Sequence, residues 1–416
     1  MPKISDFWKF WAGQTISNFG SSFTEFVLPL LIFKLTGSAL NLAIASATTF
    51  APYLLFGLPI GAWVDRADRK RLMIATDIGR MLVIGSIPLL AALDRLPVEW
   101  IYLAGFLSST LTIAFNSAEF AAIPSLVSQD DLVTANGRIQ ASYSAATVLG
   151  PLLAGLLAAL APLPELLLVD AASFLLSAGS LALIGRSFNS AAPPAERASL
   201  WADMREGLRY VLRHPVLRNI SLMMALVNFF GSTIHAQLVL FAKERLAASD
   251  TQVGLLYSAG SVGVVLISLA AGSLRKRWAF STIVLGTLAL EGVCIVALSA
   301  TRWYWLALPI WTVSSGLGIL FNINTSSLRQ AIVPNHLLGR VVSVAGVLAW
   351  SAIPLGTLLG GLAITWTGNV ALVFGVIGAL VVGIPLLFAF TPLGHAERYL
   401  QSQEPEVRSQ ESGVAG

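Results

Sequence analysis

The chain has 416 residues, of which 56% are hydrophobic and only 12% are charged. A soluble globular protein of this length needs far more polar surface, so the composition predicts a polytopic membrane protein. The net charge is +4, but the basic residues fall between apolar runs, which is the pattern of membrane topology and not of nucleic-acid binding. The single cysteine, Cys294, excludes an intrachain disulfide.

Twelve apolar stretches are long enough to cross a hydrocarbon core of about 30 Å as helices. They lie at about residues 6–33, 41–64, 72–93, 98–117, 132–160, 165–184, 216–242, 253–274, 281–300, 304–325, 338–366 and 370–390. Six precede a polar linker and six follow it. The sequence therefore predicts an all-α membrane protein with two pseudo-symmetric six-helix bundles, at residues 1–186 and 216–391.

A linker at residues 187–215 joins the predicted bundles, and a polar tail follows at residues 392–416. Within the linker, apolar residues recur at helical spacing from Leu200 to Leu212, with Ser199 as a candidate N-cap. This pattern predicts an amphipathic helix on the cytoplasmic surface. A plain solvated connector explains the same residues equally well.

The distribution of basic residues predicts the orientation. With both termini in the cytoplasm, twenty Lys and Arg residues fall on the cytoplasmic side of the membrane and five on the other side, and Arg80 lies within a span. This asymmetry follows the positive-inside rule. We therefore expect a multi-pass protein of the cell (inner) membrane with both termini cytoplasmic.

The most charged loop lies between the second and third stretches. It reads Gly61-Ala-Trp-Val-Asp65-Arg66-Ala-Asp68-Arg69-Lys70-Arg71, which is too polar to lie in hydrocarbon. The pattern Gly-x-x-x-Asp-Arg-x-x-Arg-Lys resembles the signature loop of the major facilitator superfamily of transporters. Asp68 stands where that family usually has Gly, and we expect Asp to tolerate the left-handed turn.

Helix 5 carries a second motif, Gly150-Pro151-x-x-Ala154-Gly155. It resembles the Gly-Pro-x-x-Gly-Gly element of exporters in this superfamily, and it permits a kink and a tight helix contact. The eleventh stretch carries a related element, in which Gly361 corresponds to Gly155. Such a correspondence between the two halves of the sequence is expected of a duplicated transporter. The linker from Arg205 to Pro215 resembles that of the bacterial enterobactin-exporter and macrolide-efflux branch.

Four helices carry polar residues on one face, and the resemblance implies that these four line a central cavity. The residues are Gln14, Asn18, Ser21 and Glu25 in the helix of the first apolar stretch; Ser109, Thr112, Asn116 and Glu119 in that of the fourth; Ser221, Asn228, Ser232 and His235 in that of the seventh; and Thr312, Ser315, Asn322, Ser326 and Arg329 in that of the tenth. Such a stripe must face protein or water. Small polar residues at this spacing also mark close helix packing, as in the stripe of helix 6 from Asp170 to Ser180.

Glu25 is the leading candidate for a proton or cation site, because desolvation of a carboxylate at bilayer depth favours proton binding. A satisfied interhelical hydrogen bond is an equal alternative. Glu119 is expected near the cytoplasmic end of helix 4, where an interfacial role is the simpler explanation. His235 is a further candidate, although a lone His is more often a hydrogen-bond partner.

Asp77 and Arg80 lie at i and i+3 in helix 3 and are expected to pair close to the basic loop. By resemblance, this pair and the loop residues Gly61, Asp65, Arg66, Arg69 and Lys70 form a gate. Asp65 is expected near Arg340, at the start of the stretch at residues 338–366, and Gly61 is expected to allow that stretch to pack closely on the stretch at residues 41–64. A purely topogenic role for the basic residues is the alternative.

These features predict a secondary active transporter that exports a small amphipathic molecule, such as a drug, macrolide or siderophore-like compound, by alternating access and proton antiport. Helix 4 has no Arg, although many antiporters of the superfamily carry one there for proton coupling. An uptake permease of the same fold and a non-transporting sensor or receptor are the alternatives. We find no catalytic or metal-binding motif, and expect no enzyme activity, cofactor or metal. The expected partners are the lipid bilayer, the substrate and protons, with the protein as a monomer.

Overall fold

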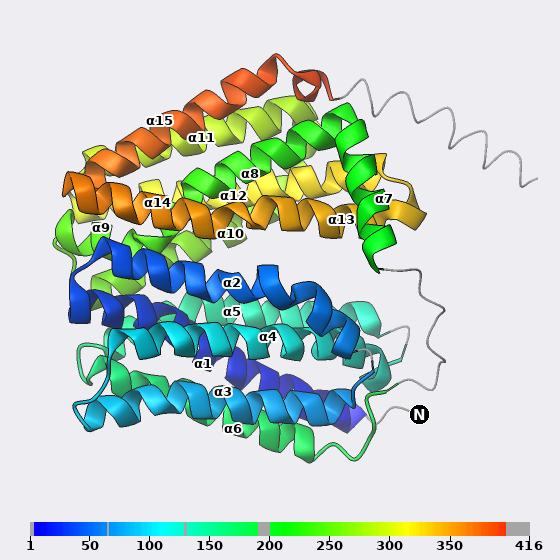
Figure 1. The fold of residues 1–416 in the computed structure, drawn as a ribbon, viewed down its shortest axis with the longest axis vertical. Coiled ribbons are helices and arrows are strands. Elements are labelled where there is room, and N and C mark those ends of the chain that lie inside the picture. Colours follow the sequence, from blue (N-terminus) through cyan, green and yellow to red (C-terminus); the bar gives the residue numbers. More distant parts are fainter. Residues whose placement is uncertain (1–3, 65, 129–130, 190–199, 397–416) are drawn as a thin grey trace, which may run out of the picture. The chain divides into compact units, whose positions relative to one another are not determined.

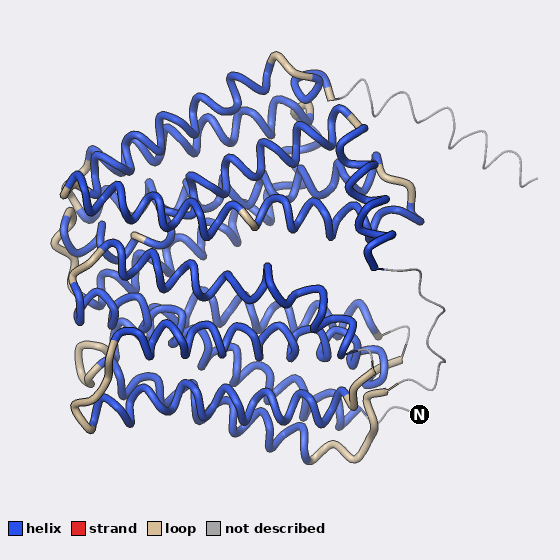
Figure 2. The backbone as a smooth tube through the Cα atoms, in the orientation of Figure 1, coloured by secondary structure: helices blue, strands red, loops and turns tan. Residues whose placement is uncertain are grey.

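A computed structural model describes residues 4–64, 66–128, 131–189 and 200–396, and every regular element of these residues is a helix (Figures 1 and 2). In chain order the helices are α1 (Ile4–Thr36), α2 (Ala39–Val64), α3 (Arg69–Ala92), α4 (Val98–Leu126), α5 (Leu132–Leu157), α6 (Leu163–Ala182), α7 (Leu200–Arg213), α8 (Pro215–Ala236), α9 (Leu238–Glu244), α10 (Asp250–Arg277), α11 (Phe280–Ala300), α12 (Tyr304–Ile332), α13 (Asn335–Trp350), α14 (Ala352–Thr367), α15 (Val370–Ala389) and the 3-10 helix η1 (Pro392–His395).

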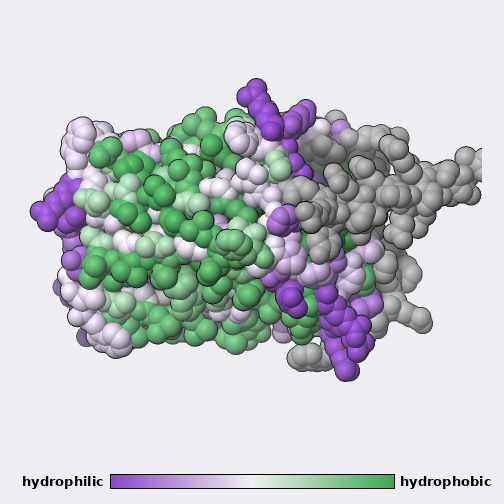
Figure 3. Space-filling view, turned by 90° about the horizontal axis from the view of Figure 1, so that it is seen from above, coloured by the Kyte–Doolittle hydropathy of each residue, from purple (hydrophilic) through white to green (hydrophobic). Residues whose placement is uncertain are grey.

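Twelve helical segments of the described residues are long and apolar enough to cross a membrane, which confirms the predicted twelve-span fold. On the face shown in Figure 3, hydrophobic side chains form a broad band and hydrophilic side chains gather at its ends. Some helices are longer than the apolar runs. In particular, α4 continues to Leu126, so Glu119 lies about two turns before the end of the helix and not at its terminus.

Two predicted spans are interrupted. The stretch at residues 216–242 divides into α8 and α9 at Gln237, and the stretch at residues 338–366 divides into α13 and α14 at Ser351. Pro354 explains the second break, because it has no N–H to donate to the carbonyl of Trp350. Apolar periodicity does not reveal such breaks, since both halves of each stretch are apolar.

The chain divides into two compact units, which we describe separately. Unit 1 contains Met1–Pro193, Ala236–Ser261 and Thr357–Gly368, and unit 2 contains Pro194–His235, Val262–Gly356 and Asn369–Gly416. Unit 1 thus combines the first six spans with short segments from the second half of the chain. The predicted boundaries of the two bundles, at residues 1–186 and 216–391, stay a prediction.

In unit 1, α6 lies beside α1 and α3, and α4 lies beside α2 and α3 (Figure 1). Its main core gathers large apolar side chains from α1, α3, α4 and α6. Its fully buried members include Phe10, Met73, Leu181 and Phe188. Close contact between helices in a membrane depends on van der Waals packing and small residues, because lipid gives no hydrophobic drive for helices to associate.

In unit 2, α11 packs along α15 and α12, and the linker helix α7 packs on α13. Residues 200–213 form a helix, and its Val211 is buried in the core of this unit. The place of this helix on the cytoplasmic surface stays a prediction. A Cβ at Gly207 would lie 2.8 Å from the carbonyl oxygen of Arg340, so the two helices touch through backbone. Burial lowers the pKa of His214, between α7 and α8, and its Nδ1 accepts a hydrogen bond from the backbone N–H of Leu217 at 3.4 Å. Ser199, the candidate N-cap, lies outside the described residues.

Candidate functional site

The polar stripe on α1 faces α6 for much of its length. The side-chain nitrogen of Gln14 donates to the Ser177 hydroxyl at 3.0 Å, and both side chains are buried. A Cβ added at Gly13 would lie 2.0 Å from Ser180 Oγ, and one at Gly20 would lie 2.1 Å from Ser173 Oγ. These contacts agree with the packing interpretation of the stripe and place Gln14 at a helix interface.

Asp170 of α6 belongs to the same interface. Its carboxylate accepts hydrogen bonds from Thr24 and from Ser21 of α1, the latter at 3.4 Å, and from Ser173 at 3.3 Å. The side chain is 1% exposed. Hydrogen bonds from three hydroxyl groups satisfy a buried carboxyl, so Asp170 is explained by packing between α1 and α6.

Glu25, one turn beyond this interface on α1, is in a different environment. Its side chain is exposed, and it makes no hydrogen bond or ion pair with another described residue. Its carboxylate lies within electrostatic range of the phenol groups of Tyr53, Tyr143 and Tyr257, from α2, α5 and α10. Asn18 is half-buried on the same helix. Glu25 is thus an accessible carboxylate, whereas the nearby acid Asp170 of α6 is buried.

Asp77 and Arg80 of α3 form the expected i, i+3 ion pair, but they lie deep inside unit 1. Arg80 lies between two aromatic rings, with its guanidinium carbon 4.4 Å from the ring centroids of Phe115 and Phe174. The ion pair with Asp77 and the two cation–π contacts stabilise the buried guanidinium charge, because water does not reach it. Arg80 Nε and Asp77 Oδ2 are buried without a hydrogen-bond partner among the described residues. The gating role that the resemblance implies for this pair stays a prediction.

The signature loop is bonded to its own unit. The Arg69 guanidinium donates to the carbonyl oxygens of Ala121 and Phe188, at 3.1 and 3.3 Å, and Lys70 donates to the carbonyl of Ile184. These cations satisfy carbonyl groups in the last two turns of α4 and in the segment that follows α6. Arg66 is exposed.

Asp68 does not adopt the left-handed turn that we expected. Its φ is −69°, so no left-handed turn forms, and its carboxylate accepts from Arg71 N at 3.0 Å as the N-cap of α3. Asp65 lies outside the described residues, so its pairing with Arg340 stays a prediction. A Cβ built at Gly61 meets no heavy atom of the described chain within 4 Å, and its contact with the span at residues 338–366 also stays a prediction.

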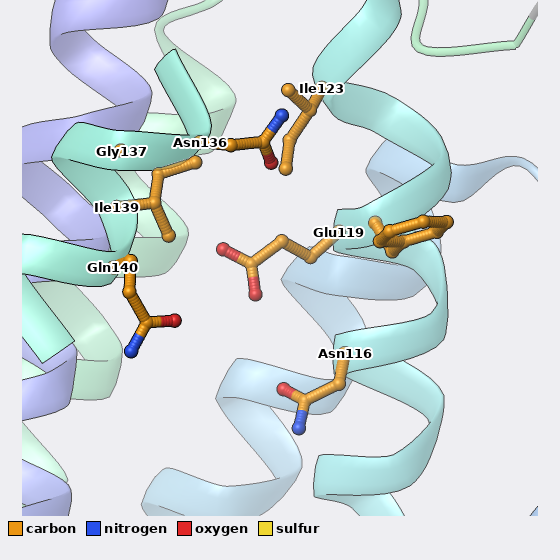
Figure 4. A pocket seen from close by; sticks show the side chains of 8 residues that line it. Asn116, Glu119, Ile123, Asn136, Gly137, Ile139 and Gln140 are labelled. Carbon is orange, nitrogen blue, oxygen red and sulfur yellow. The ribbon is translucent and has the colours of Figure 1, made fainter. Parts of the chain in front are cut away.

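A cavity of about 490 Å³ lies between α4 and α5, near the end of unit 1 where these helices connect (Figure 4). Its lining residues are Asn116, Glu119, Phe120 and Ile123 of α4 and Asn136, Gly137, Ile139 and Gln140 of α5. The carboxylate of Glu119 points from α4 across the cavity toward α5, from which Asn136 and Gln140 project (Figure 4). The structure thus brings together two predicted candidates, Asn116 and Glu119.

The α5 side of this cavity was not predicted from the sequence. Asn136 and Gln140 are four residues apart and therefore share one face of α5. This polar pair opens a long helix next to a charged loop, where polar residues are ordinary, so periodicity alone gives it no special meaning. The one available signal in the sequence is Gly137, a glycine between these two polar residues. In the structure it leaves open space beside α5, because a Cβ there meets nothing within 4 Å among the described residues.

The helix 5 motif makes two close contacts in unit 1. A Cβ at Gly150 would lie 2.3 Å from Ser22 Cβ of α1, and one at Gly155 would lie 3.1 Å from the Cα of Gly254 in α10. The reverse contact is closer, because a Cβ at Gly254 would lie 2.4 Å from the carbonyl oxygen of Pro151. The motif therefore allows backbone contact between α5 and the first turns of α10. Gly254 was not predicted as its partner.

Further contacts at this end of unit 1 join α1 and α2 to segments of the second half. Asp250 at the start of α10 accepts from Lys34 of α1 and from Lys243 of α9, each at 2.5 Å. Gln237 is fully buried and donates to the carbonyl of Ala39 at 2.7 Å. A Cβ at Gly361 would lie 2.5 Å from Ala43 Cβ. We call the contacts of residues 237, 250, 254 and 361 with α1, α2 and α5 the end clasp.

The candidates in unit 2 make separate contacts. Asn228 donates to the carbonyl of Ala349 at 2.9 Å, next to the break between α13 and α14. Asn322 is exposed and donates to Gly318 of its own helix at 3.0 Å. His235 is exposed, with its ring edge-on to Trp311 at a centroid distance of 5.4 Å.

Unit 2 also contains two charged residues, Arg340 and Glu291, in different surroundings. Arg340, predicted to meet Asp65, forms an ion pair with Glu206 of the linker helix. Glu291 of α11 was left unexplained by the sequence. Its carboxyl oxygen Oε1 is the nearest atom to a Cβ built at Gly318 of α12, at 3.3 Å, and Oε2 is buried without a partner among the described residues.

Within the described ranges, no group of three His, Cys, Asp or Glu could hold a metal ion.

The chain is similar to efflux proteins over most of its length. It is 24% identical over 365 residues to a macrolide efflux protein A of Streptococcus pyogenes, which covers 86% of this chain and 88% of that protein. It is 26% identical over 356 residues to the multidrug efflux pump Tap of Mycolicibacterium fortuitum, covering 82% of this chain and 85% of the pump.

Solved transporter structures share the fold. A bacterial homologue of the iron transporter ferroportin matches with a TM-score of 0.74 at 19% identity, over 94% of this chain and all of that one. A bacterial homologue of the lysosomal transporter Spinster matches with a TM-score of 0.73 at 15% identity, over 96% and 97% of the two chains. The family model described as transmembrane secretion effector matches residues 3–412. The chain therefore belongs to the transmembrane secretion effector family of major facilitator superfamily transporters, and it is a transporter and not an enzyme.

Proposed function

We propose that this transporter exports a small amphipathic molecule from the cytoplasm by alternating access, in exchange for protons. It acts in the cell (inner) membrane as a monomer, with both termini in the cytoplasm. The observation that carries the proposal is the α4/α5 cavity, which combines one carboxylate, three amide side chains and apolar walls in a single unit. Few polar groups among apolar ones are typical of sites for small organic ligands.

The position of the cavity favours loading from the cytoplasm. It lies near the loop between α4 and α5, and the distribution of basic residues orients that loop to the cytoplasmic side. An exporter must take its substrate from that side. The names of the efflux relatives support the same direction.

Alternating access requires contacts that form in one state and break in the other. The end clasp supplies such contacts, because it joins helices of the first half to α9, α10 and α14 of the second half through ion pairs and glycine packing. By the same charge distribution it lies on the outer side of the membrane. We propose that the end clasp opens when substrate is released.

For the proton, we propose Glu25. It is the acid on α1 that has no partner among the described residues, whereas Asp77 and Asp170 are engaged by Arg80 and by hydroxyl groups. A carboxylate without a fixed counter-charge in an aromatic surrounding can lose and gain a proton as its access changes. Because α4 carries no arginine, we assign proton coupling to Glu25.

Two alternatives stay open to experiment. An uptake permease would share the fold and carry substrate inward, and a sensor would bind ligand without moving it. Accumulation of dyes, macrolides and catecholate siderophores in an efflux-deficient host distinguishes them. We expect the wild-type protein to lower accumulation of at least one compound, and a protonophore and Glu25→Gln each to abolish the effect.

Other outcomes of that assay change the account. Lower accumulation that survives Glu25→Gln would keep export but move proton coupling to another acid. Higher accumulation would overturn the direction of transport. An unchanged panel, with the protein present in the membrane, would favour the sensor.

A further inference from the structure

The charge of the α4/α5 cavity is not balanced by its own lining. Among the described residues that line it, Glu119 is the only ionisable one; the other seven carry amide or apolar side chains or, at Gly137, none. Glu119 makes no hydrogen bond or ion pair with another described residue. A carboxylate held without a counter-ion attracts a cation of matching size.

Two basic side chains, on α3 and α5, are already engaged elsewhere. Arg80 interacts electrostatically with Glu119, but it is paired with Asp77, whose charge acts on Glu119 with the opposite sign. Arg138 of α5 is turned away: its guanidinium carbon lies 4.7 Å from the ring centroid of Trp8. Neither arginine therefore neutralises the cavity.

The amide groups favour a ligand that donates hydrogen bonds. The side-chain nitrogen of Asn136 is used by the carbonyl of Leu132 at 2.9 Å, so its oxygen is the group left to accept. Gln140 projects toward Glu119 from the same face of α5, and Asn116 lies one turn before Glu119 on α4 (Figure 4). A protonated amine is a donor without acceptors and satisfies such oxygens.

The remaining walls are apolar. Phe120 is 79% exposed, while Ile123 is buried and Ile139 is half-buried. Apolar surface beside a charged anchor suits a ligand with a hydrocarbon or aromatic body. The volume of about 490 Å³ is sufficient for such a molecule.

We propose that the α4/α5 cavity selects amphipathic organic cations, with Glu119 accepting from a protonated amine while Phe120, Ile123 and Ile139 contact its apolar body. This inference rests on the proposed export function and assigns the class of substrate that the site takes. Glu119 is then the residue that determines specificity for charge, and Glu25 the separate residue that carries the coupling proton.

The test uses two probes that differ in one charge. Dansylcadaverine carries a primary ammonium group, and its N-acetyl derivative carries the same fluorophore without the charge. Binding of each to the full-length protein in nanodiscs is followed by dansyl fluorescence. We expect the wild type to bind the amine at least about tenfold more tightly than the acetylated probe, as a charge-assisted hydrogen bond predicts.

Three variants assign the preference to the cavity. Glu119→Gln should remove the preference while leaving the affinity for the acetylated probe unchanged, and Glu119→Asp should restore part of it. Gly137→Leu, which adds a side chain where a Cβ has free space, should weaken binding of both probes. Glu99→Gln, in the exposed first turn of the same helix, is the matched control and should change neither affinity.

The outcomes separate this inference from the proposed function. Equal affinities of the wild type for the two probes, equal weakening of both by Glu119→Gln, or no effect of Gly137→Leu would each overturn the cation site. Export of the acetylated probe in vesicles with no preference for the amine would leave the proposed export intact and refute the selectivity. A Glu119-dependent preference in binding, with neither probe moved under any gradient, would support the cation site and refute export.

Discussion

Gly254 offers the sharpest test of the end clasp. A Cβ at this position would lie 2.4 Å from the carbonyl oxygen of Pro151 and 3.0 Å from the Cα of Gly155. Both are backbone atoms, which cannot rotate away as a side chain can, so α5 and α10 must separate. Gly254→Ala should therefore destabilise the clasped state by about 1–3 kcal/mol, the usual cost of overpacking.

That cost changes the equilibrium between states more than it changes folding. The preference of a helix for Ala over Gly, roughly 1 kcal/mol, acts in the clasped and open states alike and offsets part of the loss in overall stability. The free-energy difference between the clasped and open states is not offset in this way. A shift of 1–3 kcal/mol moves the population toward the open state by roughly 5- to 150-fold.

A buried serine reports on the clasp. Ser258, one turn beyond Gly254 on α10, is 4% exposed, and its hydroxyl has no partner among the described residues. In a background where Cys294 is replaced by Ala, Ser258→Cys should react with N-ethylmaleimide faster when Gly254→Ala is added. The expected gain is roughly 5- to 150-fold, because labelling follows the open population.

Gly272→Ala is the matched control for this experiment. It makes the same chemical change on the same helix, but a Cβ there meets no heavy atom of the described chain within 4 Å. It should leave the labelling rate unchanged. If Gly254→Ala and Gly272→Ala gave the same rate, the contact between α5 and α10 would not hold the clasp, and the reasoning from glycine packing would be refuted.

Two further predictions concern the charged pairs. Arg80→Met leaves Asp77 buried without its cation and should lower the free energy of unfolding by about 3–5 kcal/mol, while adding Asp77→Asn should recover most of the loss; thermal unfolding in detergent measures both. Equal losses for the single and double variants would argue against a paired charge. Glu206→Gln breaks the more exposed pair with Arg340 and should cost less than about 1 kcal/mol in the same measurement; a loss several times larger would mean that this pair, and not burial of Val211, holds α7 in place.

The spans and their basic loops were predictable because the signal is local. A run of about twenty apolar residues has few alternatives to a membrane helix, and the twelve predicted runs correspond to twelve spans in the structure. The pair of Asp77 and Arg80 was predictable for the same reason, since i, i+3 spacing places both on one helical face.

The direction in which a polar stripe faces was not predictable. Gln14 and Glu25 share one stripe of α1, yet Gln14 is buried against α6 and Glu25 is exposed. Spacing defines the face of a helix but not the neighbour that covers it. The glycines show the same limit, because Gly254 becomes the partner of the helix 5 motif only when α10 is placed beside α5.

The cavity between α4 and α5 was half predicted. Asn116 and Glu119 stood out because they are polar residues in an apolar helix. Asn136 and Gln140 did not, because they follow a charged loop. The fourth apolar run ends at residue 117, so the sequence predicted a helix that stops before Glu119 and suggested an interfacial position for this residue. In the structure α4 continues through Pro124 to Leu126.

Proton-coupled export is the central claim, and substrate-driven proton movement tests it most directly. The purified protein is reconstituted in liposomes that contain a pH-sensitive dye, a pH gradient is imposed, and dansylcadaverine is added. We predict a proton flux that starts with the substrate, accompanies its movement and is absent in Glu25→Gln. Substrate movement without any proton flux would contradict antiport, and the absence of both under every gradient would contradict transport of this substrate class.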